Sequence, residues 1–121
     1  MATVLVVDDE YAIAELLEAV LADEGHRVLT ASNGAQGLEA LEKERPDIIF
    51  LDYMMPVMDG AALLAHLTSR PAWRDIPVVM MSSVPEDAMT ERCRGFALFL
   101  RKPFNVFHVA QVVNSLVGDR P

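Results

Sequence analysis

Cysteine is almost absent from the sequence, since Cys93 is the single one among 121 residues. An intramolecular disulfide is therefore impossible, which agrees with a reducing compartment. The first ten residues lack the basic segment, the apolar run and the small-residue cleavage site of a signal peptide. No stretch approaches the roughly 18 apolar residues that a membrane-spanning helix needs. We therefore expect a cytoplasmic protein that does not contact the membrane.

An excess of positive charge is also absent. The net charge is -8, which argues against direct nucleic-acid binding, because that function needs a cationic face. Residues 1–60 hold 13 acids and 3 Lys/Arg, whereas residues 61–121 hold 5 acids and 7 Lys/Arg. This asymmetry leaves two interpretations open: random surface variation, or an acidic cation-binding end with a separate, more basic contact face.

The apolar residues predict a folded core and an alternation of strands and helices. A hydrophobic fraction of 52% over 121 residues suits one domain, residues 1–121. Short apolar runs, typical of buried parallel strands, occupy Thr3–Val7, Arg27–Thr30, Asp47–Leu51, Ile76–Met81 and Ala97–Leu100.

Helical spacing of apolar residues fills the segments between these runs. The first helix contains Ile13 to Leu21 and the second Ala35 to Leu41, while the fourth, from Pro85 to Arg94, has a thin apolar face. Asp59 is placed to cap the third helix, which contains Leu63, Leu64 and Leu67. The last helix is expected between an Asn105 cap and a Gly118 stop. The pattern predicts an α/β fold with helices on both faces of a five-stranded parallel sheet.

Chemically active side chains stand at the carboxyl ends of four predicted strands, where sites form in such sheets. They are Asp8 and Asp9, then Asp52, Ser82 and Lys102. Clustered carboxylates repel, and Mg2+, which prefers oxygen ligands, offsets that repulsion. A metal, a lysine, a hydroxyl and an attacking carboxylate together suit phosphoryl transfer. Each residue alone also has a structural explanation, as a helix cap, a turn former or solvated surface.

Four segments carry a recognisable pattern: Val6–Glu10, Leu51–Gly60, Ile76–Ser83 and Lys102–Phe104. In order and spacing they resemble the receiver domain of bacterial response regulators, over nearly the whole length of the chain. The resemblance implies a doubly wound, flavodoxin-like sheet in the order 2-1-3-4-5. It also implies a function in two-component signalling or a phosphorelay.

The family's roles are carried over by position. Asp52 resembles the phosphoacceptor, and Asp8, Asp9, Asp52 and the backbone carbonyl of Met54 resemble the ligands of Mg2+, for which Mn2+ can substitute. Ser82, Lys102 and Phe99 are similar to the remaining functional positions. The resemblance gives Ser82 the switch hydroxyl, Lys102 the phosphoryl-binding ammonium and Phe99 the switch aromatic. It also implies a cis peptide bond between Lys102 and Pro103.

The expected partner is a histidine kinase or a histidine phosphotransfer protein, and the downstream protein target is unidentified. Phosphorylation is expected to remodel the face formed by the fourth helix, fifth strand and fifth helix. Whether it also drives dimerisation stays open. We expect no turnover of an external substrate. The alternatives are a constitutive receiver-like interaction domain and an N-terminal receiver excised from a larger regulator.

Two enzyme-like or cofactor-binding alternatives fit the residues less well. A haloacid-dehalogenase-like phosphatase needs a second acid two residues after its nucleophile, where this chain has Met54. A flavodoxin-like cofactor binder needs a Ser/Thr/Gly-rich loop after the first strand, where Asp8, Asp9 and Glu10 stand.

Two departures from the family pattern bear on the contact with a downstream partner and on the lifetime of phosphorylated Asp52. The segment from Ser82 to Lys102 is about two residues shorter than usual, so we expect a short or loose fourth helix. Met54 and Val84 occupy the variable positions that flank the site, and neither side chain can orient a water molecule. We therefore expect slow self-dephosphorylation.

Overall fold

The computed structural model describes residues 1–90 and 94–118, in which five parallel strands alternate with five helices. The sheet has the order β2-β1-β3-β4-β5, which confirms the expected topology. The strands are β1 (Thr3–Val7), β2 (Arg27–Ala31), β3 (Ile48–Asp52), β4 (Val78–Ser82) and β5 (Leu98–Arg101). The helices are α1 (Tyr11–Asp23), α2 (Gly34–Lys43), α3 (Gly60–Ser69), α4 (Glu86–Thr90) and α5 (His108–Val117).

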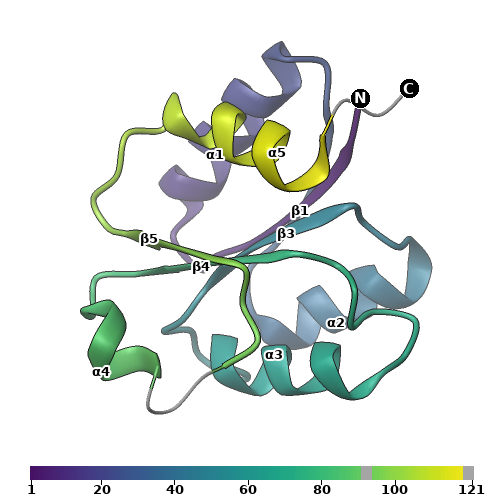
Figure 1. Ribbon diagram of the computed structural model, residues 1–121, viewed down its shortest axis with the longest axis vertical. Coiled ribbons are helices and arrows are strands. Elements are labelled where there is room, and N and C mark those ends of the chain that lie inside the picture. Colours follow the sequence, from purple (N-terminus) through teal and green to yellow (C-terminus); the bar gives the residue numbers. More distant parts are fainter. Residues whose placement is uncertain (91–93, 119–121) are drawn as a thin grey trace.

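The sheet separates two apolar layers. Helices α1 and α5 cover one face, and α2, α3 and α4 lie on the other (Figure 1). Successive side chains of β1 point to opposite faces, so Val4 and Val6 join the core under α1 and α5, whereas Leu5 and Val7 join the other core. All four are fully buried, which explains why the strand is apolar at each of these positions. None of the described helices is both long and apolar enough to cross a membrane.

Four strands end one residue later than their apolar runs predict. The ladder continues through the polar residues, because Asp52 pairs with Met81 and Ser82 pairs with Arg101. The sequence prediction placed Asp52 and Ser82 just beyond their strands, and the structure corrects this. Both are therefore fixed by the sheet rather than by loops.

The predicted helix ends are confirmed at Asp59 and Gly118 but not at Asn105. The Asp59 carboxylate accepts a hydrogen bond of 2.9 Å from the amide of Ala62, which confirms the cap of α3. Gly118, with φ of 79°, ends α5. The Asn105 cap was wrong: α5 begins at His108, and the Asn105 side chain instead accepts a hydrogen bond from the amide of Phe107. Asn105 therefore closes a local turn before the helix.

The fourth helix can be compared with the prediction only in part. The structure gives α4 as Glu86–Thr90, and Met89 is its buried residue. The expected stretch runs to Arg94 and includes Cys93, and residues 91–93 lie outside the described part of the chain. The expectation of a short or loose helix therefore stays a prediction.

Gly60 allows the chain after β3 to return against the strand. Its amide donates a hydrogen bond of 2.9 Å to the carbonyl of Tyr53. A Cβ at this position would collide with the backbone oxygen of Asp52 and would lie 2.9 Å from the Cα of Tyr53. These neighbours are backbone atoms, which cannot move aside as a flexible side chain can. Only glycine therefore keeps α3 this close to Asp52.

We predict that Gly60→Ala destabilises the protein, although alanine is normally the better helix former by about 1 kcal/mol. Overpacking against the backbone should lower the free energy of unfolding by about 2 kcal/mol or more, as measured by urea denaturation. Gly25→Ala is the control, because Gly25 has φ of 88° but open space around it, and we expect a loss of only about 1 kcal/mol. A Gly60→Ala variant as stable as the wild type would contradict the close approach.

Candidate functional site

The carboxyl edge of the sheet brings together side chains from four strands. Asp8 follows β1, Asp52 ends β3, Ser82 ends β4 and Lys102 follows β5. Asp8, Asp52 and Ser82 are only 2%, 4% and 1% exposed, and they are the buried polar residues of the described chain. Buried polar groups at one edge of an apolar sheet need a specific reason, because their desolvation is unfavourable.

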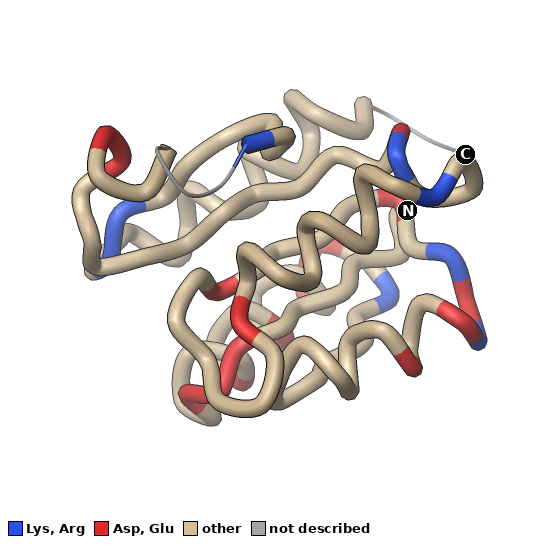
Figure 2. Tube along the Cα trace, turned by 90° about the horizontal axis from the view of Figure 1, so that it is seen from below, with Lys and Arg blue, Asp and Glu red and all other residues tan. Residues whose placement is uncertain are grey.

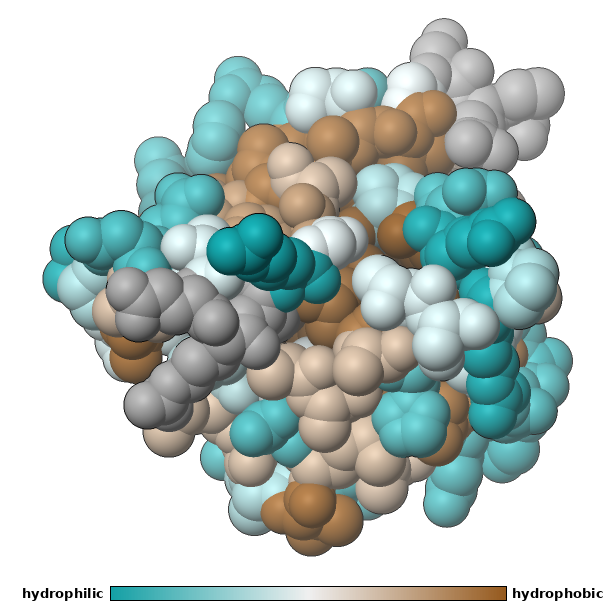
Figure 3. Space-filling model, turned by 60° about the horizontal axis from the view of Figure 1, so that its bottom comes forward, coloured by the Kyte–Doolittle hydropathy of each residue, from teal (hydrophilic) through white to brown (hydrophobic). Residues whose placement is uncertain are grey.

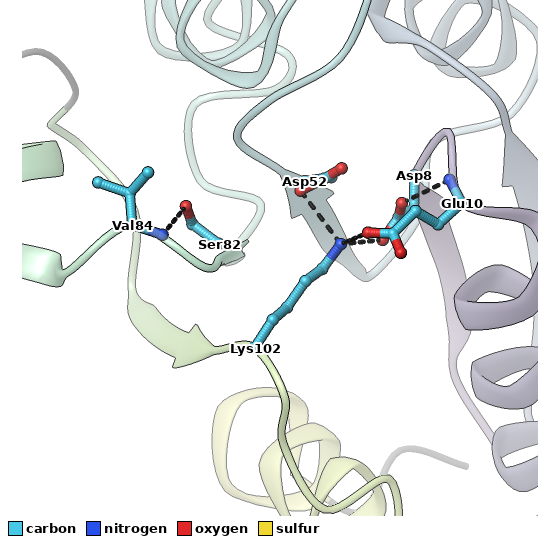
Figure 4. A network of polar contacts seen from close by, with 6 residues as sticks. All are labelled: Asp8, Glu10, Asp52, Ser82, Val84 and Lys102. Atoms are coloured by element: carbon cyan, nitrogen blue, oxygen red, sulfur yellow. Dashed lines mark hydrogen bonds and ion pairs between the residues drawn. The ribbon is translucent and has the colours of Figure 1, made fainter.

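Lys102 crosses the site and connects its acids (Figure 4). Its Nζ lies 3.0 Å from Asp8 Oδ2, 2.8 Å from Glu10 Oε1 and 3.3 Å from Asp52 Oδ1. The peptide bond from Lys102 to Pro103 is cis, as the resemblance implied. A single ammonium thus offsets the charge of three carboxylates, two beside β1 and one at the end of β3.

Asp52 resists ionisation in this environment. Burial first, and then the negative charge of Asp8, raise the pKa of Asp52 from 3.8 to about 7, although Lys102 opposes both effects. Lys102 itself loses hydration on burial, which lowers its pKa. Hydrogen bonds to Glu10 and Asp8 and the nearby acidic charges outweigh this, so the pKa of Lys102 is raised. The lysine stays charged, and the site still carries an excess of negative charge.

The acidic oxygens fit a hard divalent cation. Carboxylate atoms of Asp8, Glu10 and Asp52 all lie within 4.8 Å of one another, and oxygen atoms are the ligands that Mg2+ prefers. A cation there would also relieve the repulsion that raises the pKa of Asp52. Asp9 is exposed and lies outside this group, and the roles of Asp9 and of the Met54 carbonyl as ligands stay predictions.

Ser82 and Phe99 lie on the side of the site toward β4 and β5. The Ser82 hydroxyl accepts a hydrogen bond of 2.9 Å from the amide of Val84, and Figure 4 shows it turned toward Val84 rather than Asp52. Phe99 is half-buried and packs against the core on the α3 side of the sheet. Phe99 is paired in register with Met80, two residues before Ser82. The proposed switch residues are therefore close along adjoining strands.

Glu10 is the site residue to which the sequence interpretation gave no role. Its amide donates a hydrogen bond of 2.8 Å to Asp8 Oδ1, and its carboxylate pairs with Lys102. The sequence signal that could have indicated a role for Glu10 is its position directly after Asp8 and Asp9. Its side-chain direction depends on Lys102, which is 92 residues away, so the local sequence did not reveal the contact.

Figure 2 shows several acidic segments close together at one end of the molecule, as one of the two charge interpretations expects.

Comparison with known proteins agrees with this arrangement. The sequence profile of the response regulator receiver domain matches residues 4–114. The chain belongs to the response regulator receiver family. Such domains take phosphoryl groups from histidine kinases or phosphotransfer proteins in two-component signalling. The family assignment and the fold expected from the resemblance are thereby confirmed.

Individual relatives differ in how much of their length this chain covers. The chain is 34% identical to sporulation initiation phosphotransferase F of Bacillus subtilis, covering 93% of this chain and 90% of that protein. It is 40% identical to the response regulator PleD of Caulobacter vibrioides, covering 95% of this chain but 26% of PleD. It also spans about half (49%) of the probable transcriptional regulatory protein TcrX of Mycobacterium tuberculosis.

Solved receiver structures share the whole fold. The chemotaxis protein CheY4 of Vibrio cholerae superposes with a TM-score of 0.89 at 29% identity, covering 96% of this chain and 98% of that one. The receiver domain of the sensor histidine kinase PA1611 of Pseudomonas aeruginosa has the same TM-score at 25% identity, covering 98% of each chain. That structure has a magnesium ion coordinated in its active-site cleft.

We predict that Asp52→Asn stabilises the metal-free receiver at pH 8. With the pKa of Asp52 raised to about 7, the folded protein binds a proton between about pH 4 and 7 that the unfolded chain does not. The free energy of unfolding of the wild type therefore gains from this group as pH falls from 7 toward 4. Removing the charge should add about 2 kcal/mol at pH 8, and the gain should shrink toward pH 5.

Urea denaturation in EDTA across this pH range measures the difference. Asp75→Asn, which neutralises an exposed carboxylate, is the control and should show little effect at either pH. A difference between wild type and Asp52→Asn that does not change with pH would contradict the raised pKa.

Proposed function

We propose that Asp52 accepts a phosphoryl group from a phosphorylated histidine of a kinase or phosphotransfer protein. The observation that carries the proposal is the contact of Lys102 with both Asp52 and Asp8 in a buried, oxygen-rich site. A carboxylate oxygen of Asp52 attacks phosphorus as the bond from phosphorus to the imidazole nitrogen breaks. That nitrogen keeps the electron pair and takes up a proton, so the donor returns to neutral histidine.

The residues around Asp52 divide the work of stabilising the transferred group. Mg2+, held by Asp8 and Asp52 with the Met54 carbonyl and Asp9 as further expected ligands, would neutralise phosphoryl oxygens when bound. Lys102 adds a fixed positive charge beside Asp52. Because Asp52 attacks as a carboxylate, the positive charges around it must also keep it ionised at neutral pH.

Transmission from the site begins at Ser82. Its hydroxyl is engaged with the amide of Val84, and a phosphoryl oxygen on Asp52 would be a stronger, charged acceptor. Rotation of Ser82 toward that oxygen frees the Val84 amide and makes room for Phe99 to turn. The α4–β5–α5 face then changes shape, as a shift between two existing conformations.

The surface is suited to protein partners. Apart from Met1, the exposed large hydrophobic residues of the described chain lie on α1 or on the loops after β3 and β5, which all leave the carboxyl edge of the sheet. They are Tyr11, Leu16, Met54, Val57 and Phe107. Apolar colouring also reaches the centre of the side that carries α2, α3 and α4, between hydrophilic borders (Figure 3).

Phosphorylation is the first measurement. Incubation with acetyl phosphate and Mg2+ should add the mass of one phosphoryl group to the intact wild-type protein, and Asp52→Asn should remain unmodified. Omission of the divalent cation should abolish the adduct. An adduct that persists in Asp52→Asn, or no adduct with any donor, would overturn the assignment of Asp52.

We further predict that phospho-Asp52 hydrolyses slowly. Met54 is exposed and Val84 is half-buried, and neither side chain can donate or accept the hydrogen bond that orients an attacking water. Met54→Asn should speed hydrolysis by roughly threefold or more, as followed by the decay of the adduct after donor removal.

Val57→Asn is the matched control, because it adds the same amide to the same loop three residues further on. It should leave the decay rate unchanged. A wild-type lifetime of a few seconds, or equal decay in all three proteins, would count against this explanation.

A further inference from the structure

Carboxylates surround the ammonium of Lys102. Its Nζ donates hydrogen bonds of 3.0 Å to Asp8 and 2.8 Å to Glu10, and it forms an ion pair of 3.3 Å with Asp52 Oδ1. A lysine offers three N–H groups, so a phosphoryl oxygen that binds Lys102 competes with these acids for its donors and its charge. The question is which carboxylate gives way.

Glu10 differs from the other two partners in its exposure. Its side chain is 58% exposed, whereas those of Asp8 and Asp52 are 0% and 6% exposed. Exposed ion pairs contribute little stability, because water readily replaces either partner. Breaking a buried pair instead leaves an uncompensated charge away from water. Glu10 can therefore leave Lys102 at the smallest cost in free energy.

The Glu10 side chain has no role in the local structure of its helix. Glu10 stands at the N-cap position of α1, yet its carboxylate makes no capping hydrogen bond. Instead, its amide is held by Asp8 Oδ1, which fixes the backbone beside the site, and its carboxylate reaches Lys102 (Figure 4). The contact is therefore an arrangement of the site and not a by-product of helix formation.

We propose that Glu10 is a positioning residue that holds Lys102 in the unphosphorylated site and is displaced by an entering phosphoryl group. The proposal rests on the function assigned to Asp52 above. While the Glu10 carboxylate is bound to Lys102, it holds the ammonium inside the site. It also opposes the entry of anions, because it repels their negative charge and competes with them for Lys102. It thereby sets the affinity for anionic phosphodonors, and the chemical step at Asp52 proceeds after it has left.

This role predicts a change in binding rather than in chemistry. Glu10→Gln keeps the shape of the side chain but removes the charge that competes for Lys102. With Mg2+ present, the variant should bind beryllium trifluoride, an analogue of the phosphoryl group, about threefold to tenfold more tightly by titration calorimetry. The donor concentration that gives half-maximal phosphorylation should fall by a similar factor.

The control is Glu15→Gln, which removes one negative charge from the same helix at a residue that hydrogen-bonds with Tyr11 and is not among the partners of Lys102. Its affinity for beryllium trifluoride should change by less than about twofold, because exposed charges are screened. The urea concentration at the unfolding midpoint of Glu10→Gln should match that of the wild type. A change in affinity would then not reflect a damaged fold.

Three outcomes would overturn the proposal. Equal affinity in wild type and Glu10→Gln would show that Glu10 does not compete for Lys102. Weaker binding by Glu10→Gln would show that Glu10 supports the bound state instead. Equal gains in Glu10→Gln and Glu15→Gln would reduce the effect to net charge.

The proposed function fails separately from this proposal. If the wild type neither binds the analogue nor forms an Asp52 adduct, the phosphoacceptor assignment fails and the role of Glu10 falls with it. If the wild type does both and Glu10→Gln is indistinguishable from it, only the role of Glu10 is overturned.

Discussion

The repulsion between Asp8 and Asp52 is the constraint on which the rest of the site depends. Two unit charges about 4 Å apart cost roughly 4 kcal/mol at an effective dielectric constant near 20, and neither carboxylate can turn away into water. Lys102 offsets part of this repulsion from a position 94 residues beyond Asp8. These charges come together only when the strands that carry them are assembled, so the site exists only in the folded protein. Its residual negative charge is what makes a divalent cation a natural component.

The sheet order explains which residue types stand at which positions. β1 and β3 are neighbours, so the short side chains of Asp8 and Asp52 meet directly. β5 lies two strands from β3, a separation of about 10 Å, and a residue there needs a long side chain to reach Asp52. Lysine meets this requirement with its four-carbon stem and carries the charge that the acids need. Ser82 ends the intervening strand β4, next to β3, so its side chain needs only a short hydroxyl to reach toward Asp52.

The sequence predicts the alternation of strands and helices and the polar residues at the ends of the strands. The apolar runs located all five strands, because both faces of the sheet are covered and few polar residues interrupt them. The sequence did not predict contacts between side chains that are distant along the chain. Asp9 and Glu10 are adjacent acids, yet only Glu10 contacts Lys102, and that choice depends on the path of the chain after β5. Asn105 likewise looked like a helix cap, but the turn at Phe107 delays α5 to His108.

The position of β4 connects the chemistry to the rest of the molecule. It lies between β3, which carries Asp52, and β5, which carries Phe99. Ser82 ends β4, which is buried at every position, and close packing around this strand resists gradual deformation. In the proposed switch, a force on the Ser82 hydroxyl would act on this end of the strand. The Val84 amide, which Ser82 holds, begins the segment that leads to α4. In the proposed switch, a change in the Ser82 hydroxyl would therefore be transmitted through one loop and one adjoining strand, and that short route would require no rearrangement of the central β1–β3 pair.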